Sequence, residues 1–286
     1  MAEAPDSPEA LKAALGYERN FCRVESVESD RVALSYDLDR EHWPWLALPP
    51  AHPVLVEKVQ YFSAVTASWA SGAMQPGVRS ALTRIVWCCS PEVRSYPERG
   101  LSEPWRGERS MGYRLRAWDG AERELYEIRG EGFAFEDRDF DAWREKSRRA
   151  ARETAEPVEI DPGPDGLNFL AAPREVEGRL VALGCVPSER GFQPGHPFHT
   201  GTGDHVNAAH LFDCALQLAR HALGLAPSAA LDCRAGEARF QRFVELDAPF
   251  ELRLESDTRT SDGAEVTVGF AQGGRDNATV RLKLAP

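Results

Sequence analysis

Two apolar helical segments, each followed by a series of strand-like runs, constrain the fold of this chain more than any other feature. In the first segment, 54–74, apolar residues recur mostly three and four positions apart, which is the period of an α-helix. The small residues in this segment favour burial on most sides. In the second segment, 208–223, apolar residues gather on one face, and Gly224 follows as a helix stop. Each half of the chain therefore has the same predicted plan, in which one apolar helix precedes several long antiparallel strands.

The predicted strands alternate apolar and polar residues and are separated by turn-forming sequences. In the first half they occupy 20–38, as two short strands, and then 80–89, 110–118 and 124–135. In the second half they occupy 177–183, 229–233, 238–246, 250–257, 265–271 and 277–284. The segment 92–107 is rich in proline, glycine and charge, so it is predicted to be a loop. A strongly charged helix is predicted over 139–154.

The division into subdomains follows from the segment 156–166. It contains three prolines, two glycines and several acidic residues, so it is predicted to be a linker. The N-terminal subdomain would then cover 1–155, including the charged helix, and the C-terminal subdomain would cover 167–286, in a chain of 286 residues. One helix wrapped by a curved antiparallel sheet is the hot-dog architecture. The predicted class is therefore α+β, with a double hot dog in one chain.

Composition and charge exclude several classes of function. Hydrophobic residues make up 42% and charged residues 28%, as in an ordinary globular protein. The net charge of −11 argues against a nucleic-acid partner bound through a basic surface. Neither a signal sequence nor an apolar run of transmembrane length is present, so we expect a cytoplasmic protein with no membrane partner. The six cysteines form no C-x-x-C pair, which favours reduced thiols over disulfides.

Five of the seven histidines lie close together, between residues 196 and 221. His199 and His205 sit in or beside a glycine-containing loop that leads into the second helix, where backbone amides can approach a ligand. The other three are better explained as ordinary loop or helix residues: His196, His210 and His221. A zinc site within 196–205 lacks the ligand spacing typical of zinc motifs. We therefore predict no metal and no other cofactor.

The start of the second helix carries a family resemblance. The residues Asp204-His205-Val206, followed by Leu211, Asp213, Ala215 and Gln217, resemble the D-H-V-x-x-x-x-L-x-E-A-x-x-Q block of the A-factor biosynthesis (AfsA-like) double hot-dog family. Further similar segments are found at 52–60, 239–249 and 270–275. This resemblance implies transfer of a 3-oxoacyl chain from acyl carrier protein to a glycerone phosphate acceptor. Leu216 stands where that family has an arginine, which departs from the pattern for a phosphate acceptor.

A second resemblance is to the hydroxyacyl-thioester dehydratases, whose site pairs a loop histidine with a helix carboxylate from the opposite hot dog. The spacings H-x-x-x-G and D-x-x-x-Q occur at 199–203 and 213–217. We prefer a site that contains His199, because His199 lies in the glycine-containing loop, whereas His52 precedes a proline. The resemblance implies two candidate catalytic pairs, which are His199 with Glu57 and His52 with Asp213.

Dehydration of a 3-hydroxyacyl thioester explains why these residue types are needed. A neutral histidine is suited to removing the α proton near neutral pH. A carboxylic acid on an apolar helix has a raised proton affinity and can protonate the leaving hydroxyl. Backbone amides at the helix N-terminus polarise the thioester carbonyl. The residues expected to bind substrate near that helix are Gly203, His205, Asn207 and Gln217.

We therefore predict an enzyme that acts on an acyl thioester of acyl carrier protein or CoA, with dehydration as the first choice. Three alternatives stay open. One is AfsA-like 3-oxoacyl transfer. Another is thioester hydrolysis, in which Asp213 with Asn207 or Gln217 would position a water molecule. The third is an acyl-binding protein without catalysis. A homodimer is compatible with all of these functions.

Overall fold

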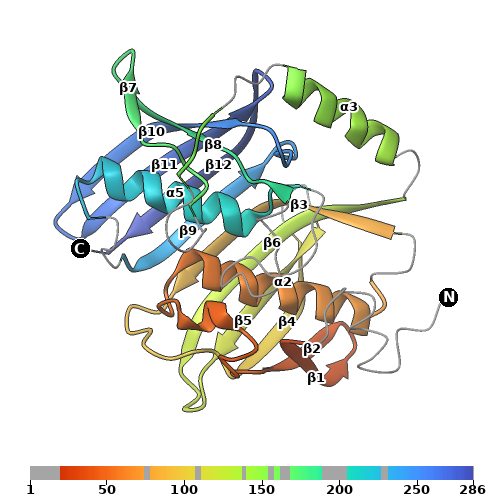
Figure 1. The fold of residues 1–286 in the computed structure, drawn as a ribbon. Helices are drawn as coiled ribbons and strands as arrows, with labels where there is room; N and C mark the ends of the chain where they lie inside the picture. The colour runs from red at the N-terminus through yellow and green to blue at the C-terminus, as the bar shows by residue number, and fades with distance from the viewer. Residues whose placement is uncertain are drawn as a thin grey trace. The chain divides into compact units, whose positions relative to one another are not determined.

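The computed structural model describes residues 20–73, 78–106, 111–136, 140–153, 158–161, 168–188, 205–226 and 231–285. The chain divides into two compact units, Met1–Asp137 and Arg138–Pro286. In the described residues of each unit, one long apolar helix accompanies an antiparallel sheet (Figure 1). This arrangement confirms the predicted α+β class and the two hot dogs.

In its described residues, the first unit contains one α-helix, one 3-10 helix and six strands. Its elements are β1 (Cys22–Glu28), β2 (Arg31–Tyr36), η1 (Pro44–Ala47), α2 (Pro53–Ala70), β3 (Val78–Cys89), β4 (Arg99–Arg106), β5 (Met111–Trp118) and β6 (Glu124–Glu136). The strands lie in the order β1-β2-β4-β5-β6-β3, and every neighbouring pair is antiparallel. Figure 1 shows α2 lying across one face of this sheet.

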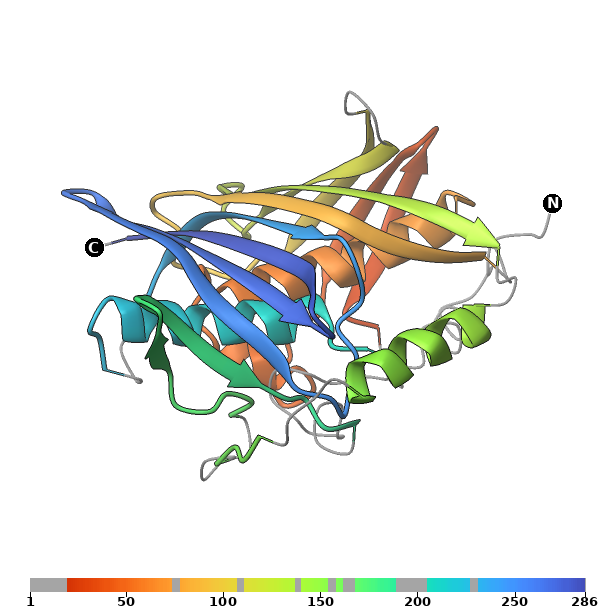
Figure 2. The ribbon, with the colours of Figure 1, turned by 90° about the horizontal axis from the view of Figure 1, so that it is seen from above.

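The second unit repeats this plan after a charged helix. Its elements are α3 (Phe140–Glu153), β7 (Arg174–Val176), β8 (Arg179–Gly184), α5 (Ala208–Ala222), β9 (Cys233–Phe240), β10 (Phe250–Thr260), β11 (Gly263–Gln272) and β12 (Arg275–Leu284). The strand order β7-β8-β10-β11-β12-β9 is the order of the first sheet with each strand replaced by its equivalent. In Figure 2 this sheet curves around α5, with the blue strands β11 and β12 above the helix and the green strands β7 and β8 below it.

The two long helices begin and end by the same means. The side chain before the first turn accepts a hydrogen bond from a backbone amide: His52 accepts from Val54 N in α2, and Asn207 accepts from His210 N in α5. Both helices end next to a glycine in the left-handed region, Gly72 with φ 72° and Gly224 with φ 70°. Helix α2 therefore ends at Ala70, before the predicted end, whereas the predicted stop of α5 is confirmed. Among the described residues, no helix is long and apolar enough to cross a membrane.

Aromatic side chains form much of the core beneath α2. The rings of Phe21 and Trp45 are 4.6 Å apart, and Phe62 from α2 stacks on Trp45 at 6.1 Å. All three are at most 1% exposed. Large aromatic rings contribute most of the apolar area that a small core can bury. This cluster therefore anchors α2 against the first strands of its sheet.

One loop prediction and one pair of strand predictions are wrong. The segment 92–107 is not a continuous loop, because it contains β4. Strand β4 lies between β2 and β5, but β2 pairs only with residues 99–102. Pro104 therefore has no partner in β2, and its missing backbone N–H removes no hydrogen bond between β4 and β2. Strands were predicted at 229–233 and 238–246; residues 229 and 230 lie outside the described residues, and from 231 to 246 the structure has the single strand β9. Its small residues have low strand propensity, but pairing with β12 overrides that preference.

The charged helix α3 groups with the second unit, whereas the sequence placed it before the 156–166 linker. The physical reason is a buried ion pair. Arg144 of α3 is fully buried and pairs with Glu245, which follows β9. Ala151, on the same side of the helix, is 4% exposed. These contacts tie α3 to the second unit.

Candidate functional site

The best-defined polar pair on an apolar helix is Asp213 with Gln217, both on α5. Gln217 Nε2 donates a hydrogen bond of 2.9 Å to Asp213 Oδ2. The two residues are four positions apart and so share one face of the helix. Asp213 is 8% exposed, and its helical neighbours Phe212, Cys214 and Leu216 are fully buried. A carboxylate and a side-chain amide are thus held together in an apolar setting.

Burial raises the pKa of Asp213 to about 6. The hydrogen bond from Gln217 and the positive charge of Arg220 both act in the opposite direction and limit the rise. A carboxyl group that titrates near pH 6 can take up or release a proton close to neutrality. This property makes Asp213 the strongest candidate for acid–base chemistry among the described residues of the second unit.

Asn207 and His205 lie at the start of α5. Asn207 Oδ1 caps the helix by accepting from His210 N at 3.2 Å and lies 2.6 Å from His210 Nδ1. Its oxygen is therefore committed to the helix end, and Gln217 is the amide that meets Asp213. The ring of His205 packs edge-on against Phe243, with centroids 4.6 Å apart. His205 thus lies just before the helix, in contact with Phe243.

We expect Asn207→Ala to lower the free energy of unfolding by roughly 1 kcal/mol, because it removes the cap of α5. Asn207→Asp keeps a capping oxygen and is the matched control. Urea unfolding of the three proteins measures the difference. Equal stability of the Ala and Asp variants would contradict the capping role.

Glu57 occupies the equivalent region of α2 and is 4% exposed. Burial raises the pKa of Glu57, while the neighbouring Lys58 ammonium opposes the rise. Lys58 Nζ lies 3.8 Å from Glu57 Oε2, and Lys58 is itself 3% exposed. The first unit therefore holds a buried carboxylate beside a buried cation, whereas Asp213 is hydrogen-bonded to a neutral amide.

Gln60 of α2 and Tyr113 of β5 complete the polar group around Glu57, and neither these two residues nor Lys58 was predicted from the sequence. Gln60 Nε2 donates to Tyr113 Oη, and burial raises the pKa of the Tyr113 hydroxyl. Gln60 follows Glu57 by one helical turn, so its place on the same face was visible in the sequence. Tyr113 comes from β5, and nothing local in the sequence connects it with α2.

His52 caps α2, which bears on the role predicted for it. Its Nδ1 accepts a hydrogen bond of 3.3 Å from the backbone amide of Val54, and the residue is 6% exposed. When Nδ1 accepts, the proton of a neutral imidazole lies on Nε2. Accepting a further proton at Nδ1 would break the cap. The capping contact therefore disfavours His52 as a general base.

His199 and Gly203 lie outside the described residues, so the pair of His199 with Glu57 stays a prediction. His52 and Asp213 belong to different units, and their pairing stays a prediction as well. The structure brings Asp213 and Gln217 together and places Asn207 at the start of the same helix. Within the described ranges, no group of three or more His, Cys, Asp or Glu side chains is arranged to bind a metal ion.

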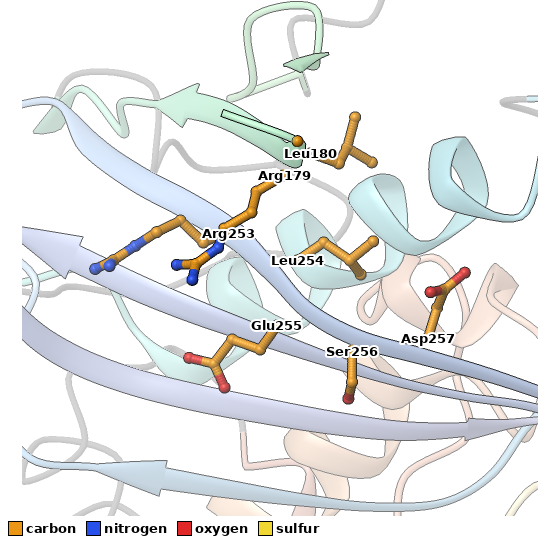
Figure 3. A pocket seen from close by; sticks show the side chains of 8 residues that line it. Arg179, Leu180, Arg253, Leu254, Glu255, Ser256 and Asp257 are labelled. Carbon is orange, nitrogen blue, oxygen red and sulfur yellow. The ribbon is translucent and has the colours of Figure 1, made fainter. Parts of the chain in front are cut away.

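A surface hollow of about 510 Å³ lies in the second unit, where β8 and β10 separate (Figure 3). Their ladder ends at Val181 and Arg253, and the hollow is lined by 178–180 and 253–257. Its lining combines arginine, acidic and leucine side chains. The candidate residues of α5 are not part of that lining, so the hollow is a feature separate from the Asp213 pair.

The fold and the helix pair define the class of structure: the chain has a double hot-dog fold. It is similar to the structure of the 12:0-ACP thioesterase from Umbellularia californica, with a TM-score of 0.56 at 11% identity. That match covers 91% of this chain and 99% of the other. At such low identity, the similarity concerns the fold.

Two further solved structures are similar over most of their length. The tesB protein of Mycobacterium avium subspecies paratuberculosis has a TM-score of 0.49 at 15% identity, with 98% of this chain and 100% of that chain covered. The dehydratase domain of RzxB from Pseudomonas fluorescens has a TM-score of 0.49 at 12% identity, with 90% and 94% covered. No protein-family model and no curated protein sequence matches this chain. The resemblance to A-factor biosynthesis proteins stays a prediction from the sequence.

Proposed function

We propose that the protein is an acyl-thioester enzyme, that Asp213 and Gln217 are central to its site, and that it hydrolyses the thioester. The observation that carries this proposal is the part-buried hydrogen-bonded pair on α5, with Gln217 Nε2 2.9 Å from the buried Asp213 Oδ2. The fold similarity to an acyl carrier protein thioesterase supports a thioester substrate. A carrier-bound substrate is favoured for the same reason, with a CoA thioester as the alternative.

In the proposed reaction, Asp213 accepts a proton from a water molecule while the Gln217 amide orients both groups. The water oxygen bonds to the thioester carbonyl carbon, and the carbon–sulfur bond then breaks. The proton held by Asp213 passes to the departing thiolate, so the products are a carboxylic acid and a free thiol. A pKa of about 6 leaves Asp213 largely ionised at neutral pH, as this role requires.

Dehydration is the second candidate, and the same raised pKa favours it. A carboxyl group with a pKa of about 6 keeps its proton on a fraction of molecules near neutrality, which suits a general acid. Burial also raises the pKa of Glu57, the carboxyl group paired with His199 in the preferred dehydratase site. Dehydration would use the predicted histidine as base, whereas hydrolysis would use the ionised Asp213.

Incubation with a 3-hydroxyacyl thioester, on acyl carrier protein and separately on CoA, tests the proposal. We expect free thiol to accumulate at a rate that depends on Asp213. An unsaturated thioester lighter by one water molecule would support dehydration and contradict hydrolysis. Stoichiometric binding of the acyl chain without either product would contradict both and indicate an acyl-binding protein.

A further inference from the structure

The second unit contains a fully buried ion pair between α3 and the segment that joins β9 to β10. Arg144 Nη1 lies 3.1 Å from Glu245 Oε1, and Nη2 lies 2.9 Å from Oε2. The two side chains are 0% and 1% exposed. Burying two charges costs free energy that their mutual attraction often only just offsets. A gain in stability is therefore a weak explanation for this ion pair. Its position offers another explanation.

Phe243 connects Arg144 with the start of α5. The Arg144 guanidinium carbon lies 4.2 Å from the centroid of the Phe243 ring, an arrangement that favours cation–π attraction. The same ring contacts His205 at 4.6 Å. The backbone continues the connection, since Val206 N donates to Val244 O at 2.9 Å. A chain of direct contacts therefore runs from α3 to the residues that precede the cap of α5.

Hydrogen bonds from two side chains of the sheet also hold the backbone of segment 243–248 in place. Gln272 accepts from Glu245 N at 2.7 Å and donates to Glu245 O at 3.1 Å and Ala248 O at 3.0 Å. Asn277 Nδ2 donates to Phe243 O at 2.6 Å. With the backbone held by these amides, the Arg144 contacts act on the side chains of Phe243 and Glu245.

We infer that Arg144 is a positioning residue that sets the orientation of His205 and the start of α5 through Phe243. The role of His205 in substrate binding rests on the proposed function, whereas the positioning itself does not. The planar guanidinium provides two parallel contacts to Glu245 and a flat surface for the ring. Lysine would keep the positive charge but provide neither feature. Arg144→Lys therefore separates the effect of the planar guanidinium from the effect of its charge.

Hydrogen exchange at the Val206 amide tests the positioning without any substrate. We expect Arg144→Lys to speed exchange at Val206 about tenfold or more, because the Val206–Val244 bond opens more readily. Arg149→Lys, at an exposed position of the same helix, is the matched control and should leave this rate unchanged. Phe243→Leu keeps the ion pair, removes the ring and should have the same effect as Arg144→Lys. Unchanged Val206 exchange in both variants would overturn the inference.

Steady-state kinetics with an acyl thioester test the effect on His205. We expect Arg144→Lys to raise KM roughly fivefold or more with little change in kcat, and to have no further effect when His205 is already alanine. Fully additive effects of the two substitutions would show that Arg144 does not act through His205. If no thioester turns over, the proposed function fails, and the hydrogen-exchange result still decides the positioning.

Discussion

Asp213→Asn is expected to abolish thioester turnover and to make the protein more stable at neutral pH. Asparagine has almost the same shape as aspartate but cannot accept the proton from water, so kcat should fall roughly 10²–10⁴-fold. The Gln217 amide can still donate to the asparagine oxygen, which keeps the local geometry. Thiol release at saturating substrate measures the effect on kcat.

The gain in stability follows from the sign of the pKa shift. The pKa of Asp213 is about 6 in the folded chain, raised from 3.8 by burial, so the folded state binds this proton more tightly than the unfolded state. The free energy of unfolding therefore falls as pH rises from about 4 to about 6 and stays lower above that range. Asparagine removes this cost, which is about 3 kcal/mol for a shift of roughly two pKa units.

Urea unfolding of the wild type and Asp213→Asn at several pH values checks this prediction. The two proteins should differ little below about pH 4 and should diverge as the pH rises to about 6. Asp257→Asn, an exposed carboxyl on β10, is the matched control for both activity and stability. Loss of activity in the Asp257 variant alone would instead place the chemistry at the surface hollow of Figure 3.

Glu245→Ala is expected to cause the largest loss of stability, about 3–5 kcal/mol. The substitution leaves the fully buried guanidinium of Arg144 without its counter-charge. Arg148, whose Nε lies 4.0 Å from Glu245 Oε2, loses a partner as well. The hydrogen bonds between the backbone of residue 245 and Gln272 do not need the Glu245 side chain. The loss of stability therefore measures the loss of the ion pair.

Two comparisons make this prediction specific. Glu237→Ala breaks the ion pair with the exposed Arg239 on β9 and should cost less than about 1 kcal/mol. The double variant Arg144→Met with Glu245→Leu replaces both charges by apolar groups and should recover most of the stability lost in Glu245→Ala. Similar losses for Glu237→Ala and Glu245→Ala would contradict the account of the buried pair.

The repeated helix-and-sheet plan was predictable because it is encoded locally. Apolar periodicity located α2 and α5, and the strand runs after each helix indicated antiparallel sheets. Strand β4 was missed because its proline and glycine are local signals for a loop. Its conformation depends on pairing with two neighbouring strands, which no local pattern records.

In the candidate site too, features within one helix could be predicted from the sequence, and contacts between distant residues could not. The D-x-x-x-Q spacing singled out Asp213 and Gln217, and the structure shows a hydrogen bond between them that the sequence reasoning had left open beside a role for Asn207. The link between Arg144 and Glu245 joins residues 101 positions apart and could not be seen in the sequence. The cap that His52 provides for α2 was not predicted, because it depends on the backbone geometry at Pro53, and the catalytic role of His52 stays a prediction.

The pH dependence of kcat/KM for thiol release tests the central claim most directly. If ionised Asp213 is the base, kcat/KM should rise as pH increases to about 6 and then level off, and this inflection should vanish in Asp213→Asn. A rate that falls as pH increases through about 6 would show that the protonated acid is required and would contradict hydrolysis by this route. Full activity in Asp213→Asn at every pH would contradict the site itself.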